Sequence, residues 1–219
     1  MTTKDEPLIG LKDSDRLLVE PIWINPIDEI EGPLYLAYIA ENPTYNSVFV
    51  RQSVDKMLNS AADSLPLRYK LIVRAGHRPL SVQQKLLEMV KQDYLTKNPG
   101  STKQEALNFA RTFVSDPAVK LPPHCCGAAI DVDVLDCETG VLVDFGCPVN
   151  TDNEIAFVDS GKISTTHAAN RQMLSKAMTK AGFAPFKYEW WHFSYGDQTW
   201  ALYYKKQEIY GLIEPEIGQ

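Results

Sequence analysis

Cysteine is scarce in this 219-residue chain, with only four residues: Cys125, Cys126, Cys137 and Cys147. No two of them have the C-x-x-C spacing of many redox and metal sites. Cys125 and Cys126 are adjacent, which leaves too little freedom for ordinary disulfide geometry between them. We therefore expect four reduced thiols in a reducing compartment, and not a small scaffold stapled by disulfides.

Long apolar segments and an excess of basic charge are also missing. No run approaches the ~18 apolar residues of a membrane-spanning helix, and the N-terminal residues lack the basic and apolar regions of a secretory signal. The formal net charge is -6, and an acidic surface repels phosphate backbones. The sequence therefore predicts a cytoplasmic location, no membrane span and no nucleic-acid partner.

What remains is the composition of an ordinary globular protein. Hydrophobic residues make up 44% and charged residues 23%, enough for one sizeable core. Neither an internal repeat nor a linker divides the chain, so we expect a single domain over residues 1–219. Residues 1–45 are rich in proline and turn residues, which favours an irregular N-terminal wrap with a short strand or two.

Hydrophobic periodicity predicts the main elements of this domain. Helical spacing of apolar residues predicts helices over residues 47–65, 82–95 and 166–180. Another helix is expected to open at Ser101, with Glu105 one residue too late for a strict capping box. Strands are predicted over residues 69–73, 128–135, 141–143 and 186–195, and the first of them is followed by the turn that holds Arg78. This mixture predicts an α+β fold with a central, mainly antiparallel sheet flanked by helices.

Two segments carry the side chains that catalytic zinc prefers. His124 is followed by Gly127 and then by Asp131, which starts the polar face of the predicted 128–135 strand. Glu189 and His192 lie three residues apart in an aromatic segment. Catalytic zinc sites use three such protein ligands and leave a fourth position open. On a flat strand Glu189 and His192 would face opposite ways, so a shared site requires a bend between them.

Spacing alone leaves plainer interpretations open. A His and an Asp seven positions apart occur by chance in many chains, and a Trp-Trp-His run is typical of an aromatic core. Arg78 taken alone favours a surface salt bridge.

The motifs together resemble the zinc D-alanyl-D-alanine dipeptidases and the related D,D-carboxypeptidases. The family pattern is an Arg-Pro, then His-x-x-Gly-x-Ala-x-Asp, then Glu-x-x-His. The matching segments occur in that order, and the resemblance extends over residues 67–201, the expected catalytic core. They are His77-Arg78-Pro79, His124-Cys125-Cys126-Gly127-Ala128-Ala129-Ile130-Asp131, Phe145-Gly146-Cys147-Pro148, Asn170-Arg171-Gln172-Met173-Leu174 and Glu189-Trp190-Trp191-His192.

The resemblance implies a role for each matched residue. His124, Asp131 and His192 would bind one zinc ion per chain. Glu189 would be the catalytic base, and Arg78 would stabilise the transition state. The implied reaction is hydrolysis of the small dipeptide D-Ala-D-Ala to D-alanine, in the turnover of peptidoglycan precursors.

Two positions depart from the family and affect the expected substrate pocket, which Trp191 is also expected to flank. Pro122 stands where the better-known dipeptidases have a serine that helps to hold the substrate. Asn150 stands where they have an aspartate that receives the free amino group. Two alternatives therefore stay open, a D,D-carboxypeptidase for longer cell-wall peptides and a zinc-binding module without catalysis. Retention of Glu189 and Arg78 argues against the second.

Overall fold

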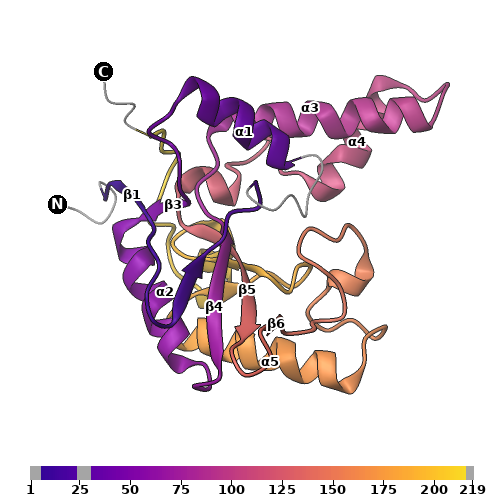
Figure 1. Cartoon of the computed structure of the whole chain (residues 1–219). Helices are drawn as coiled ribbons and strands as arrows, with labels where there is room; N and C mark the ends of the chain where they lie inside the picture. The colour runs from indigo at the N-terminus through magenta and orange to yellow at the C-terminus, as the bar shows by residue number, and fades with distance from the viewer. Residues whose placement is uncertain (1–5, 24–30, 216–219) are drawn as a thin grey trace.

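The computed structural model describes residues 6–23 and 31–215, and a mainly antiparallel sheet lies at its centre (Figure 1). The strand order is β2-β4-β5-β8-β7, with β6 paired to β5. β2 and β4 are parallel, and the other pairs of this sheet are antiparallel. The strands are β2 (Leu17–Val19), β4 (Tyr69–Ala75), β5 (Ala129–Asp136), β6 (Val141–Leu142), β7 (Ala184–Pro185) and β8 (His192–Ser194). A separate two-stranded sheet pairs β1 (Leu8–Gly10) with β3 (Phe49–Arg51).

Helices cover the central sheet and extend away from one end of it. α2 (Gln52–Ser64) and α5 (Thr165–Lys180) pack their buried apolar residues into the same core as the sheet. α3 (Leu80–Lys97) and α4 (Lys103–Phe113) form a hairpin that projects at the upper right of Figure 1, beside α1 (Glu31–Glu41). The shorter helices are η2 (Pro123–Cys126), η3 (Glu154–Ala156) and α6 (Gln198–Tyr204). Among the described helices, none is long and apolar enough to cross a membrane.

Strand β5 joins the hydrophobic core to a polar face. Ile130, Val132 and Val134 belong to the core cluster, while Asp131 and Asp133 alternate with them and therefore face the opposite side of the sheet. Both carboxylates are nevertheless buried. This arrangement confirms the predicted α+β fold and places Asp131 on the face opposite the core.

The N-terminal region is more regular than the sequence predicted. Short strands occur there as expected, but residues 31–41 form the helix α1. Pro33 lies in the first turn of that helix, where the backbone N–H has no partner within the helix and a proline is tolerated. The prediction of an irregular wrap over residues 1–45 is therefore wrong for α1, while residues 1–5 and 24–30 lie outside the described part.

Three other boundaries differ from the prediction. Residues 49–51 form β3 because they pair with β1, so the helix predicted from residue 47 begins only at Gln52. α4 is capped by Thr102, not Ser101, and Thr102 with Glu105 makes a strict capping box. The strand predicted over residues 186–195 is limited to β8, because a turn occupies the residues just before it.

Candidate active site

Asp131 and His192 meet because their strands are in register. β5 and β8 are antiparallel, and Asp131 is the direct partner of His192. Side chains at opposed positions of such a pair project on the same face. The His192 Nδ1 atom lies 3.0 Å from Asp131 Oδ1, and the His192 Nε2 atom lies 3.3 Å from the Ser194 hydroxyl.

His124 reaches the same place from the short helix η2. That helix ends at Gly127, whose left-handed φ of 75° turns the chain into β5. A Cβ atom at Gly127 would also lie 2.6 Å from the Leu8 side chain, so both backbone and packing favour glycine there. His124 Nδ1 donates to the Gly76 carbonyl oxygen at 2.8 Å, which leaves Nε2 directed at Asp131 Oδ2, 3.3 Å away.

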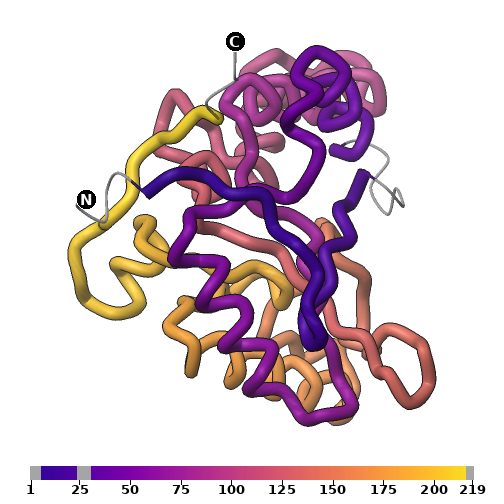
Figure 2. The backbone as a smooth tube through the Cα atoms, turned by 60° about the vertical axis from the view of Figure 1, so that its left-hand side comes forward, coloured from indigo at the N-terminus to yellow at the C-terminus, as the bar shows by residue number. Residues whose placement is uncertain are grey.

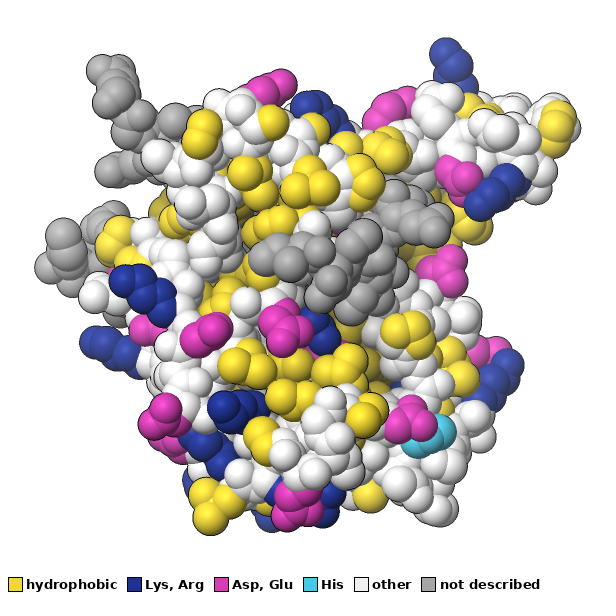
Figure 3. Space-filling model, viewed as in Figure 1, with side chains coloured by type: hydrophobic (Ala, Val, Ile, Leu, Met, Phe, Trp, Pro, Cys, Tyr) yellow, Lys and Arg dark blue, Asp and Glu magenta, His cyan; other side chains and the backbone are white. Residues whose placement is uncertain are grey.

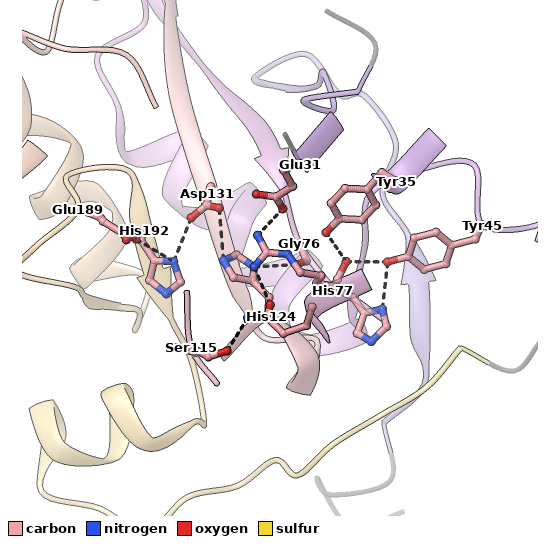
Figure 4. Close-up of polar contacts among 12 residues, drawn as sticks. Glu31, Tyr35, Tyr45, Gly76, His77, Ser115, His124, Asp131, Glu189 and His192 are labelled. Atoms are coloured by element: carbon pink, nitrogen blue, oxygen red, sulfur yellow. Dashed lines mark hydrogen bonds and ion pairs between the residues drawn. The ribbon is translucent and has the colours of Figure 1, made fainter. Parts of the chain in front are cut away.

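These three side chains form a buried group suited to a metal ion. Figure 4 shows Asp131 between the rings of His124 and His192, and one ligand atom from each lies within 4.8 Å of the other two. Burial opposes the charged form of Asp131, but the two histidines lower its pKa well below the ordinary value. Two imidazole nitrogens and one carboxylate oxygen are a donor set of catalytic zinc, and the Gly76 and Ser194 contacts hold the rings as outer partners do in such sites. The residues therefore fit zinc.

Glu189 lies beside this group without belonging to it. A turn precedes β8, and the His192 N–H donates to the Glu189 carbonyl oxygen at 3.3 Å. This is the bend that a shared site required. The Glu189 carboxylate lies 3.7 Å from His192 Nδ1, and 32% of its side chain stays exposed. The surrounding cleft walls desolvate the carboxyl group and raise its pKa above the ordinary value.

Arg78 is held on the other side of the group by partners that the sequence did not indicate. Its guanidinium makes an ion pair with Glu31 and donates to Gln83 Oε1 at 2.8 Å. Burial by itself would lower the pKa of Arg78, but the Glu31 carboxylate and other neighbouring groups raise it above its ordinary value. Arg78 therefore carries a permanent positive charge at the site.

Glu31, Gln83 and Tyr35 are the supporting residues missed by sequence reasoning. The Tyr35 hydroxyl donates to the His77 carbonyl oxygen at 3.3 Å, next to Arg78 in the chain. Glu31 and Tyr35 are both in α1, where the sequence predicts irregular structure. Gln83 was assigned to a helix, but its spacing gives no sign of contact with Arg78.

A cleft of about 1090 Å³ opens over these residues. It runs between the α3–α4 hairpin and the loop around residues 148–157, where Figure 3 shows a notch below the projecting arm. The expected pocket residues Pro122, Asn150 and Trp191 all line it. Trp190 does not, because it stacks on Phe145 in the core.

The remaining histidines and cysteines lie outside the metal group. His77 is buried and contacts Tyr45 and the Ile213 carbonyl oxygen, and His167 helps to cap α5. Cys125 and Cys126 are both free and buried, and burial raises the pKa of each thiol to about 12. They are therefore packing residues with little thiolate character.

Comparison with known proteins identifies the family. The model of a family described as D-Ala-D-Ala dipeptidase matches residues 41–210. The chain belongs to the D-Ala-D-Ala dipeptidase family. It is therefore a peptidase, as the motifs predicted.

Individual D-Ala-D-Ala dipeptidases are similar to the chain over much of their length. A D-alanyl-D-alanine dipeptidase of Synechocystis sp. is 26% identical over 232 residues, which cover 89% of this chain and 91% of that protein. A D-alanyl-D-alanine dipeptidase of Enterococcus faecalis is 27% identical over 162 residues, covering 67% of this chain and 77% of the other.

Solved structures give more distant matches. The vancomycin resistance D,D-pentapeptidase VanY, in complex with Zn(II), aligns with a TM-score of 0.42 at 20% identity, over 68% of this chain and 74% of that one. VanYB in complex with D-alanine-D-alanine aligns with a TM-score of 0.44 at 19% identity, over 75% and 82%.

The acidic residues near Asn150 differ in their positions relative to the cleft. The dipeptidase resemblance implies an aspartate at position 150. Asp144 is not among the residues that line the cleft, and it lies 3.1 Å from His167 Nε2. Glu154 lines the cleft but forms an ion pair with Lys162. Asp152 lines the cleft two positions after Asn150 in the chain.

Proposed function

We propose that this peptidase is a zinc-dependent D-Ala-D-Ala dipeptidase, with one zinc ion held by His124, Asp131 and His192. The observation that supports this most directly is the buried three-residue group beside Glu189 and Arg78 in one cleft. A purely structural zinc site needs neither of the last two residues. The dipeptide is the substrate named for the family and for the similar curated proteins.

Zinc, when bound, would polarise the scissile carbonyl group and make a water molecule more acidic. The Glu189 carboxylate accepts the proton of the attacking water and passes it to the departing amino group. Arg78 faces the same cleft and offers a fixed positive charge to the oxygen on which negative charge develops. The Gly76 carbonyl oxygen and the Ser194 hydroxyl would keep the two imidazole rings oriented toward the ion.

A D,D-carboxypeptidase activity on longer cell-wall peptides is the second candidate. It is favoured by the size of the cleft, which extends from Arg78 along the α3–α4 hairpin as far as Asn98. Both reactions break the same kind of bond with the same residues. They differ in whether the cleft prefers a free or an acylated amino group.

Metal content and hydrolysis test the proposal together. Purified protein should contain one zinc ion per chain and release D-alanine from D-Ala-D-Ala, and a chelator should abolish that release. His192→Ala should lose most of the zinc, because it removes one of three protein ligands. Full zinc retention by a folded His192→Ala variant would remove His192 from the ligand set, and wild type without hydrolytic activity in the presence of zinc would favour the inactive module.

A further inference from the structure

Residues 211–215, which we call the C-terminal strap, lie beyond the segment that the family model matches. In Figure 2 this yellow segment runs up the outside of the molecule toward the start of α3. The strap crosses the two turns that carry Arg78 and His124, and it makes hydrogen bonds with both turns.

One strap residue joins the neighbours of Arg78 and His124. The Ile213 N–H donates to the Cys125 carbonyl oxygen at 3.0 Å, and the Ile213 carbonyl oxygen lies 2.8 Å from His77 Nε2. A carbonyl oxygen only accepts, so His77 carries its proton on Nε2. Since His77 precedes Arg78 and Cys125 follows His124, the strap ties together the backbones beside two site residues.

The next strap residue caps α3. Glu214 Oε1 accepts from the Leu80 N–H at 3.1 Å, and Leu80 is the first residue of that helix. The N-cap position is occupied by Pro79, which makes no side-chain cap. A carboxylate at a helix N-terminus satisfies an open donor and interacts favourably with the helix dipole. Glu214, which is 134 positions after Leu80, thus provides the side-chain cap that Pro79 does not provide.

Arg51 fixes the beginning of the strap. This buried side chain donates through Nε to the Cys126 carbonyl oxygen at 2.9 Å and through Nη2 to the Gly211 carbonyl oxygen at 3.4 Å. The guanidinium also lies over the Tyr210 ring, 4.8 Å from its centroid. The strap is therefore anchored before it reaches the catalytic turns.

We infer that Glu214 is a positioning residue for Arg78, an inference that rests on the role proposed for Arg78 above. Gln83, which accepts from the Arg78 guanidinium, lies in the first turn of α3 and its N–H bonds to the Pro79 carbonyl oxygen at 3.0 Å. Fraying of that turn would loosen Gln83 and the backbone at Arg78 together. A displacement of about 1 Å at a catalytic group is enough to cost roughly 100-fold in rate.

The test begins with kcat and KM for D-Ala-D-Ala. Glu214→Ala should lower kcat roughly tenfold, with little change in KM, because Arg78 acts mainly on the transition state. Glu214→Gln should recover most of this loss, since its amide oxygen still accepts from Leu80. Glu208→Ala, an exposed carboxylate just before the strap, is the matched control and should behave as wild type.

A second route removes the donor and leaves Glu214 in place. Leu80→Pro deletes the N–H at the first helical position, where proline is well tolerated, and Pro79 already has the extended ψ of 143° that a following proline requires. Leu80→Pro should lower kcat by the same factor as expected for Glu214→Ala, and it provides this test even if Glu214→Ala folds poorly. Unchanged kcat in Leu80→Pro would overturn the inference.

The decisive measurement combines these changes with Arg78→Ala. If Glu214 acts through Arg78, Glu214→Ala should cost almost nothing further in the Arg78→Ala background. Independent, multiplied losses would overturn the inference and assign Glu214 to general stability. Wild-type kcat in Arg78→Ala alone would instead overturn the role of Arg78 in the proposed function, so the two failures are distinguishable.

Discussion

Glu189 and His192 are three residues apart, yet the turn between them gives their side chains different tasks. His192 faces Asp131, while Glu189 stands 3.7 Å from the His192 ring and outside the ligand group. Glu189→Gln keeps the size of the side chain and removes its ability to accept a proton. We expect normal zinc content and a kcat lower by about 10²–10⁴-fold, measured by metal analysis and D-alanine release.

The matched control for this prediction is Glu138→Gln. Glu138 is an exposed carboxylate on the hairpin after β5, paired with Arg68, so its removal should leave both measurements unchanged. Near-normal turnover by Glu189→Gln would refute its role as the base. Loss of zinc from that variant would place Glu189 among the ligands.

The motif residues of the site could be predicted from the sequence through the family resemblance, whereas their supporting partners could not. The structure brings His124, Asp131 and His192 together as the motifs predicted. Glu31 pairs with Arg78 across 47 positions, and no periodicity or motif connects the two. Such contacts depend on how α1 packs beside α3, which a single sequence does not reveal.

At the scale of elements, β5 shows why some predictions succeed. Its alternation of aspartates with Ile130, Val132 and Val134 is the pattern of a strand with two different faces, and β5 has that form. β3 shows why others fail. Its residues continue the apolar spacing of α2, but pairing with β1 makes them a strand. Tertiary pairing, which local spacing does not encode, decided that boundary.

The loop after α4 offers a pH-dependent test of how the cleft wall is held. Asp116 accepts from the Ala118 N–H at 2.8 Å and from Arg111 Nη2 at 2.6 Å. These contacts lower the pKa of Asp116. Because the pKa of Asp116 is lower in the folded state, its carboxylate stabilises the protein at pH values above its unfolded-state pKa of about 4. This contribution is lost as the pH falls through the folded-state pKa.

Asp116→Asn should therefore destabilise the protein at pH 7 by up to about 1 kcal/mol and by progressively less below about pH 4. Urea unfolding of both proteins at pH 7 and pH 3 measures the difference. Asp159→Asn, at an exposed position, is the control and should change neither value. A deficit that is the same at both pH values would show that the Asp116 charge contributes nothing.

At the scale of the whole molecule, the cleft is much larger than the group formed by His124, Asp131 and His192. These three residues and Arg78 are buried in the cleft, whereas Asn98, Asp152 and Glu154 line it at exposed positions. A dipeptide with a free amino group has to place that charge near the buried residues. Burying an ammonium group without a partner is costly, so the polar residues beside the reacting centre decide between the two candidate substrates.

Asn150 is the residue on which this choice depends most. It lines the cleft and has a left-handed φ of 65°, a conformation that Asn and Asp both tolerate. An amide oxygen accepts a hydrogen bond from an ammonium group but supplies no opposing charge. We therefore expect free D-Ala-D-Ala to be cleaved with a higher kcat/KM than acetyl-D-Ala-D-Ala, by a modest factor.

Asn150→Asp should sharpen that preference, since it adds a negative charge without changing the backbone requirement. A charged hydrogen bond exceeds a neutral one by about 1 kcal/mol, which corresponds to roughly a fivefold gain in selectivity. Asp152→Asn serves as the companion variant and should weaken the preference if Asp152 assists Asn150 from the cleft wall. A wild type that prefers the acetylated substrate would favour the carboxypeptidase instead, because only a longer peptide presents an acylated nitrogen there. Unchanged selectivity in Asn150→Asp would move the amino-group site away from position 150.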